Sequence, residues 1–142
     1  MAKNVASWSK DPSTQVGAIA VGAQGQILSQ GYNGFPRGIK DHPRRLEDRE
    51  EKYKYVVHGE MNCIYNSCLN GTSMAGSSVY VYGLPVCSEC AKGLIQVGVS
   101  KVVMQHPVDI PDIWAERYQI SAQMFREAGI PATRYDLEGN VI

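Results

Sequence analysis

Two short stretches, His58-Gly59-Glu60 and Pro85-Val86-Cys87-Ser88-Glu89-Cys90, decide the fold and the chemistry expected of this chain. Each stretch is a loop that leads into a predicted helix, so His58 and Cys87 are expected at helix starts. Cys90 follows Cys87 by three residues and would face the same way on its helix. One histidine and two cysteine side chains can therefore converge on one metal ion.

This ligand set is typical of a catalytic zinc site. Catalytic zinc usually has three protein ligands and an open position for water, whereas structural zinc is closed by four. The H-x-E and C-x-x-C spacings match the H-x-E…P-C-x-x-C signature of zinc-dependent nucleobase deaminases, whose Glu is a general acid/base and not a ligand. Glu60 stands at that position. A helix N-terminus also lowers the pKa of a thiol, which favours Cys87 and Cys90 as thiolate ligands.

The alternative is a structural zinc site closed by a fourth residue. The candidates for that residue are Cys63, Cys68, His42 and His106. Helical spacing from His58 turns Cys63 away from the metal, and a closed site would have no use for Glu60. We therefore interpret Cys63 and Cys68 as small buried apolar residues. Four cysteines in 142 residues, two of them in C-x-x-C, do not favour a disulfide framework.

Composition predicts one compact domain, residues 1–142, that acts on a small substrate. Hydrophobic residues make up 44% of the chain, charged residues make up 20%, and the formal net charge is zero. A neutral chain lacks the broad basic surface expected of a nucleic-acid partner. The first residues contain no apolar run of the length of a signal peptide or membrane span, so we expect a cytoplasmic protein with no membrane partner.

Hydrophobic periodicity and turn residues predict an α/β order of elements. The expected strands are 16–21, 27–32, 79–82, 101–104 and 132–137, and the expected helices are 1–10, 58–70, 90–97 and 111–128. The first two strands read as a hairpin, while helical crossovers make the later strands parallel. Trp114 and Tyr118 are interpreted as core or subunit-interface residues rather than platforms for stacking bases.

Three other segments are candidates for binding. Ser7, Lys10, Ser13 and Thr14 surround a turn that could hold a phosphate or be an ordinary polar turn. Asn33 lies in a glycine-rich loop, and its amide could bond a sugar hydroxyl or simply form a turn. The mixed-charge stretch 40–54 could be solvated, or could form a lid or a subunit contact.

Four runs of sequence closely resemble the deoxycytidylate (dCMP) deaminases of the zinc-dependent cytidine and deoxycytidylate deaminase family. They are SKDPSTQVGA at 9–18, GYNGFPRG at 31–38, HGEMN at 58–62 and CSECAK at 87–92. The likeness extends from about Ser7 to Gly129. Two positions depart from the family pattern, because Gly59 replaces the usual Ala and Val86 separates Pro85 from the first cysteine. Neither departure removes a ligand.

The resemblance implies a three-layer cytidine-deaminase-like fold. In that fold a central five-stranded mixed sheet of order 2-1-3-4-5 is flanked by helices, and the protein usually assembles as a homo-hexamer. It also implies hydrolysis of dCMP to dUMP and ammonia, which supplies dUMP for thymidylate synthesis. Zn2+ is implied on His58, Cys87 and Cys90, with water attacking C4 of the cytosine. Glu60 would then protonate N3 and the departing amine.

The same resemblance implies sites for the rest of the nucleotide and for effectors. The expected substrate contacts are Asn33 to the deoxyribose, Ser7 and Lys10 to the 5′ phosphate, and Gly59. Many relatives are activated by dCTP and inhibited by dTTP, bound with Mg2+, and the matching residues are Gly31, Tyr32, Gly34, Arg37, Arg44 and Arg45. Two rival functions are a deaminase acting on cytosine or adenine in nucleic acid and a catalytically inactive zinc-binding module.

Overall fold

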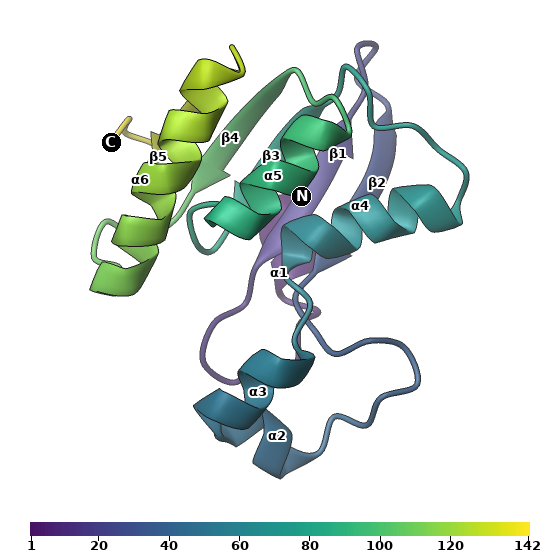
Figure 1. Ribbon diagram of the computed structural model, residues 1–142, viewed down its shortest axis with the longest axis vertical. Coiled ribbons are helices and arrows are strands. Elements are labelled where there is room, and N and C mark those ends of the chain that lie inside the picture. The colour runs from purple at the N-terminus through teal and green to yellow at the C-terminus, as the bar shows by residue number, and fades with distance from the viewer.

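A five-stranded mixed sheet of order β2-β1-β3-β4-β5 forms the centre of the protein, which is described here by a computed structural model of residues 1–142 (Figure 1). The strands are β1 (Gly17–Val21), β2 (Ile27–Tyr32), β3 (Ser78–Tyr82), β4 (Lys101–Gln105) and β5 (Ala132–Tyr135). β1 pairs antiparallel with β2 and β3, and the pairs β3–β4 and β4–β5 are parallel. The expected sheet order and strand directions are therefore confirmed.

Helices lie on both faces of this sheet and give three layers. One face is covered by α4 (Gly59–Leu69), α5 (Ser88–Gln96) and α6 (Asp112–Glu127), as Figure 1 shows. The short helix α1 (Ala2–Ala6) packs against β1 on the other face, where a Cβ atom on Gly17 would collide with the α1 backbone. No helix combines the length and the apolar character needed to cross a membrane.

The main core lies between the sheet and α4, α5 and α6. Alternate strand residues point to the same face, and the small or branched residues of β1, β3 and β4 meet the helices there. These core residues are Ala18, Ala20, Val79, Val81, Val102 and Met104. Leu94 of α5 and Phe125 of α6 complete the cluster and are almost fully buried. This packing fixes the C-terminal ends of β3 and β4 beside the starts of the helices that follow them, α5 and α6.

Some expectations about single residues are wrong. The first helix is expected over residues 1–10 with Val5 and Trp8 on one face, but it ends at Ala6; Val5 is buried, whereas Trp8 is 55% exposed and contacts Tyr32. Cys63 is buried as expected, but Cys68 lies exposed on α4. The two cysteines are five positions apart in the helix, so their side chains point to different sides of α4.

The mixed-charge stretch forms two short helices, α2 (Pro43–Glu47) and α3 (Arg49–Tyr55), that project from the body of the protein (Figure 1). The side chain of Asp48 accepts hydrogen bonds from the amides of Glu50 and Glu51 and so begins α3. Gly34 and Val57 exchange two backbone hydrogen bonds, of 3.1 and 2.8 Å. Residues 35–56 therefore form a segment with closed ends, which we call the α2–α3 arm.

Candidate metal centre and active-site cavity

Three side chains converge where the starts of α4 and α5 meet. His58 is the N-cap residue of α4, Cys87 is the N-cap residue of α5, and Cys90 lies one turn further along α5. The Nδ1 atom of His58 lies 3.4 Å from both sulfur atoms. A tetrahedral zinc ion with ordinary Zn–N and Zn–S bonds separates such atoms by about 3.5 Å. The three residues therefore fit a zinc ion without rearrangement.

The ligand group contains only these three residues. Their ligand atoms all lie within 4.8 Å of one another, and no other His, Cys, Asp or Glu joins the group. The four residues considered as a closing ligand, Cys63, Cys68, His42 and His106, are thus not part of it. A shell of three protein ligands leaves one tetrahedral position open, as in catalytic zinc sites.

The two thiols are prepared for metal binding by their mutual contact. Hydrogen bonds from Cys90 and His58 to its sulfur lower the pKa of Cys87 to about 4, although burial acts in the opposite direction. The pKa of Cys90 is raised because its thiol donates to Cys87 and is itself buried. The hydrogen bond to Cys87 also raises the pKa of His58. A divalent ion would take the place of the protons held in this cluster.

Glu60 lies in the first turn of α4 and is only 4% exposed. Burial raises the pKa of its carboxyl group to about 7, and His58 opposes this shift by favouring the charged form. A carboxyl group with such a pKa can both accept and release a proton near neutral pH. Glu60 lines the same cavity as His58, so its position suits proton transfer to a substrate bound beside the metal.

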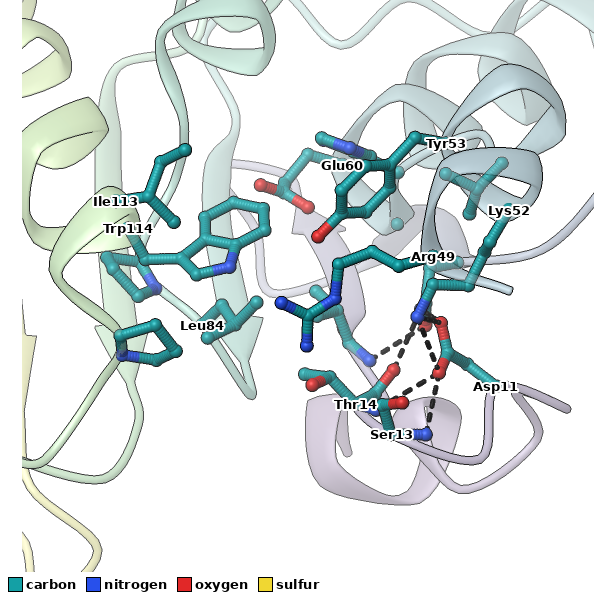
Figure 2. Close-up of a pocket in the computed structure, with 17 residues that line it drawn as sticks. Asp11, Ser13, Thr14, Arg49, Lys52, Tyr53, Glu60, Leu84, Ile113 and Trp114 are labelled. Carbon is teal, nitrogen blue, oxygen red and sulfur yellow. Dashed lines mark hydrogen bonds and ion pairs between the residues drawn. The ribbon is translucent and has the colours of Figure 1, made fainter. Parts of the chain in front are cut away.

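This active-site cavity is built from distant parts of the chain (Figure 2). Its lining includes Asp11, Ser13, Thr14 and Asn33; Arg49, Lys52 and Tyr53 of α3; His58, Gly59 and Glu60; Leu84 and Pro85; and Pro111, Ile113 and Trp114. The catalytic residues and the α2–α3 arm therefore face one space. The arm is therefore a wall of the cavity, and its roles as a lid or as a subunit contact stay predictions.

Trp114 packs against the core as expected and also lines the active-site cavity. Its ring lies beside the His58 ring, with 6.0 Å between centroids, and Arg117 lies 5.0 Å from the centre of its indole. It thus forms a wall of the cavity and is also partly buried against the hydrophobic core, while Tyr118 is buried as expected. In the sequence the two aromatic residues look alike, because the spacing within α6 does not say which one meets the metal ligand.

The loop before Cys87 is held by α6. The hydroxyl group of Ser121, which is fully buried, donates a 2.7 Å hydrogen bond to the Val86 carbonyl. Val86 itself is completely buried in the core, and Pro85 lines the cavity. The extra residue between Pro85 and Cys87 is therefore accommodated by packing, and the first sulfur ligand keeps its place at the start of α5.

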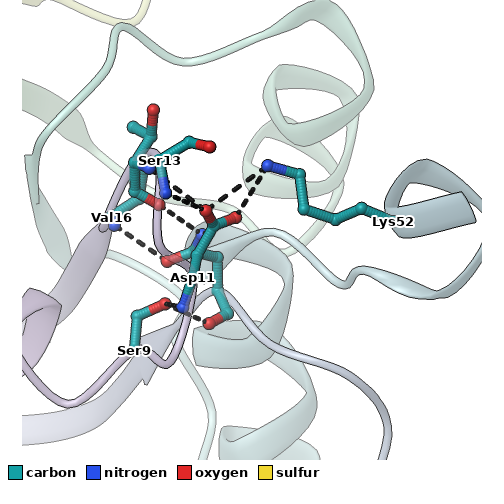
Figure 3. A network of polar contacts seen from close by, with 7 residues as sticks. Ser9, Asp11, Ser13, Val16 and Lys52 are labelled. Atoms are coloured by element: carbon teal, nitrogen blue, oxygen red, sulfur yellow. Dashed lines mark hydrogen bonds and ion pairs between the residues drawn. The ribbon is translucent and has the colours of Figure 1, made fainter. Parts of the chain in front are cut away.

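A buried ion pair joins the α2–α3 arm to the polar turn after α1 (Figure 3). The ammonium group of Lys52 lies 3.2 Å from Asp11, and the two side chains are only 10% and 7% exposed. The same carboxylate accepts hydrogen bonds from the amides of Ser13, at 2.8 Å, and Thr14, at 3.1 Å. One aspartate thus shapes the turn and anchors the helix that covers it.

Replacing Lys52 with alanine is expected to lower the free energy of unfolding by about 2 kcal/mol or more, because the Asp11 charge would stay buried without its partner. Urea unfolding followed by circular dichroism measures the change. Lys54→Ala is the matched control on the same helix, since Lys54 pairs with Glu51 in an exposed position, and it should leave the unfolding midpoint unchanged. Equal midpoints for the two variants would contradict a stabilising role for the buried pair.

Asn33 lines the cavity, but its amide group already bonds the backbone. Its oxygen accepts a 2.8 Å hydrogen bond from the Val16 amide, and its nitrogen donates a 2.9 Å hydrogen bond to the Thr14 carbonyl. The contact between Asn33 and a deoxyribose stays a prediction. Gly59 is also at the cavity, and an added Cβ atom would lie 3.1 Å from the Val16 carbonyl oxygen, so glycine lets α4 approach β1 closely.

Ser7 and Lys10, the residues predicted to bind the phosphate, do not line this cavity. The Ser7 hydroxyl donates to the Asn4 carbonyl within α1. The Lys10 side chain is 72% exposed and pairs with Asp41 at 2.8 Å. Their neighbours Ser13 and Thr14 do face the cavity, so the structure separates the two halves of the predicted cluster.

The six residues predicted to bind a regulatory nucleotide are not brought into one cavity. Arg44 and Arg45 line a shallow cavity of the arm with Glu47, Asp48 and Glu51, and none of the other four residues lines it. Gly31 is buried beneath α4, where a Cβ atom would collide with the backbone nitrogen of Cys63. Among the remaining three, Tyr32 is 40% exposed, Gly34 bonds Val57, and Arg37 donates to Asn66.

Comparison with known proteins adds independent information. The family described as "Cytidine and deoxycytidylate deaminase zinc-binding region" matches residues 1–106. The "Uncharacterized deaminase in luxG 3'region" of Aliivibrio fischeri is 39% identical over 139 residues, which cover 97% of this chain and 90% of that protein. The "Deoxycytidylate deaminase" of Homo sapiens is 44% identical over 100 residues, covering 67% of this chain and 54% of the human protein.

A second animal relative and a solved structure are also similar to this chain. The "Probable deoxycytidylate deaminase" of Drosophila melanogaster is 40% identical over 89% of this chain and 64% of its own length. The present chain thus spans between about half and two thirds of the two animal proteins. The dCMP deaminase of cyanophage S-TIM5, solved in complex with dCMP and dUMP, superimposes with a TM-score of 0.72 at 24% identity. The match covers 94% of this chain and 90% of the phage chain, and it shows a common fold.

Proposed function

This chain belongs to the cytidine and deoxycytidylate deaminase family, and from that premise we propose that it converts dCMP and water to dUMP and ammonia. The observation that carries the proposal is the convergence of three candidate zinc ligands, one of which, His58, lines the same cavity as the buried Glu60. The names of the human and Drosophila relatives support dCMP as the substrate. The proposal covers the chain as a whole, 1–142, as a single catalytic domain.

The protein groups divide the work of such a reaction. His58, Cys87 and Cys90 would hold zinc, which when bound lowers the pKa of a water molecule and makes it a nucleophile. Glu60 takes one proton from that water and transfers it to N3 of the cytosine. Once the oxygen is bonded to C4, Glu60 takes the remaining proton from that oxygen and passes it to the 4-amino group, so that the C4–N bond breaks, the C4 carbonyl forms and ammonia leaves. The buried setting of Glu60 suits these transfers because it keeps bulk water away from the carboxyl group.

The test is a comparison of substrates with the zinc-loaded protein. We expect kcat/KM for dCMP to exceed that for deoxycytidine by far more than tenfold, because an unused phosphate site leaves polar groups without partners. The change in ultraviolet absorbance that accompanies loss of the cytosine amine is used to measure the rates. The substrates compared are dCMP, deoxycytidine, dCTP and a cytosine-containing oligonucleotide. Faster turnover of the oligonucleotide would instead support a nucleic-acid deaminase, and stoichiometric zinc without any turnover would indicate an inactive module.

Regulation and assembly stay predictions carried by the resemblance. Activation by dCTP and inhibition by dTTP are measured in the same assay, by adding each triphosphate with Mg2+ while dCMP is varied. Light scattering of the purified protein measures the molar mass of the assembly and so tests the expected hexamer. Self-association is supported by the outer face of the sheet, which α1 covers only in part and where Tyr80 and Val103 line an apolar groove. The supply of dUMP and the cytoplasmic location are likewise predictions.

A further inference from the structure

Arg49 is the one uncompensated cation of the active-site cavity apart from the metal ligand His58. Only one other cationic residue, Lys52, lines the cavity, and its charge is balanced by Asp11 at 3.2 Å. The side chain of Arg49 makes no hydrogen bond and no ion pair with any residue of the protein. The acidic residues of the lining are Asp11, which is used by Lys52, and Glu60, which belongs to the catalytic centre. The cavity therefore offers a free guanidinium group to a bound anion.

Hydroxyl groups without protein partners surround the same space. Ser13 and Thr14 use their backbone amides to bond Asp11, but their side-chain hydroxyls make no hydrogen bond within the protein. The Tyr53 hydroxyl is also without a partner. Figure 2 shows Arg49 and Tyr53 reaching into the cavity from α3, with Ser13 and Thr14 on the facing turn. A guanidinium group with nearby hydroxyls matches the donors that a phosphate monoester needs.

We propose that Arg49 binds the 5′ phosphate of the substrate and sets the preference for a nucleotide over a nucleoside. This inference rests on the proposed function, because it takes the substrate to be a cytosine nucleotide. Arginine suits the role because its planar fork can donate two parallel hydrogen bonds to phosphate oxygens. The phosphate would replace water around a guanidinium group that has no competing carboxylate.

The buried pair between Lys52 and Asp11 gives Arg49 its position. Arg49 and Lys52 are three residues apart on α3, so they lie on the same side of this helix. Lys52 fixes that side against the turn at Asp11, and Arg49, one turn earlier, is thereby aimed at the cavity. Lys10 has no comparable position, because it pairs with Asp41 at the surface.

The test compares Arg49→Ala, Arg49→Lys and the control Lys54→Ala, each loaded with zinc. Arg49→Ala should lower kcat/KM for dCMP about 10- to 100-fold, the usual worth of a charge-assisted contact, and lower that for deoxycytidine far less. Arg49→Lys should recover part of the loss, since it keeps the charge but not the fork. Lys54 lies on the same helix but outside the cavity, so Lys54→Ala should leave the ratio of kcat/KM for dCMP to kcat/KM for deoxycytidine unchanged. Calorimetric titration should show the matching loss of affinity for dUMP, but not for deoxyuridine.

The outcomes separate this inference from the proposed function. If the wild-type protein prefers dCMP and Arg49→Ala keeps that preference, the inference on Arg49 is overturned while dCMP deamination stands. An equal loss for dCMP and deoxycytidine would also overturn it, because it would show a structural effect of the substitution. If the zinc-loaded wild-type protein turns over neither compound, the proposed function fails and the inference fails with it.

Discussion

Glu60→Gln should lower kcat by several orders of magnitude and leave one zinc ion bound per chain. Glutamine has nearly the same shape as glutamate, but it cannot accept or release the protons that the reaction moves. General acid/base catalysis contributes about 10² to 10⁴ at each step, and Glu60 serves both the activation of water and the departure of ammonia. Because Glu60 is outside the ligand group, metal content should not change. Steady-state kinetics on dCMP and atomic absorption on the same sample give both values.

Glu127→Gln serves as the control for this substitution. Glu127 is exposed at the end of α6 and lines none of the cavities described, so its replacement should preserve turnover. Turnover of Glu60→Gln within tenfold of the wild type would show that another group moves the protons. Loss of zinc from Glu60→Gln would show instead that Glu60 takes part in holding the metal.

Cys90→Ala should abolish both metal binding and deamination. Two ligands would remain, His58 and Cys87, and an open site of two ligands holds zinc far more weakly than three do. A bound metal would also link the starts of α4 and α5, which carry His58 and Cys87, so its loss should lower the melting temperature of the protein. Zinc content after dialysis, thermal unfolding and dCMP turnover measure the three effects.

The exposed cysteine of α4 provides the matched control. Cys68→Ala removes the same thiol group from a position outside the ligand group, so zinc content and turnover should match those of the wild type. Full zinc and full activity in Cys90→Ala would contradict the three-ligand site. Zinc loss in Cys68→Ala would support the closed structural site, in which a third cysteine is the fourth ligand.

Local signals in the sequence were sufficient to predict that the candidate zinc ligands converge. His58 and Cys87 are followed directly by helices, and a side chain at a helix start has a narrow range of directions, so their convergence with Cys90 could be predicted. The glycines and the alternation of apolar residues likewise predicted the five strands close to their observed bounds. The order of the strands in the sheet came from the family resemblance, because hydrophobic periodicity does not specify which strands are neighbours.

The rest of the cavity depends on contacts between distant residues. Lys52 looked like one charge among many in a polar stretch, and only the position of Asp11, 41 residues earlier, makes it a buried ion-pair partner. Trp114 became a cavity wall for a similar reason, because α6 places it beside His58. The closeness of Lys10 to Ser13 in the sequence suggests a phosphate-binding role, but the Lys10 side chain pairs with Asp41 at the surface. Sequence spacing carries no information about such choices.

The closed ends of the α2–α3 arm bear on how enzymes of this kind can diverge. The two backbone hydrogen bonds between Gly34 and Val57 hold the ends of the arm together beside β2 and α4, so a change in length within residues 35–56 would leave both ends of the arm at the same place. The residues proposed to carry out deamination lie outside the α2–α3 arm, whereas Arg49 and Tyr53 lie within it. A new substrate range could therefore be acquired by exchanging one contiguous piece of the gene, with the catalytic apparatus inherited intact.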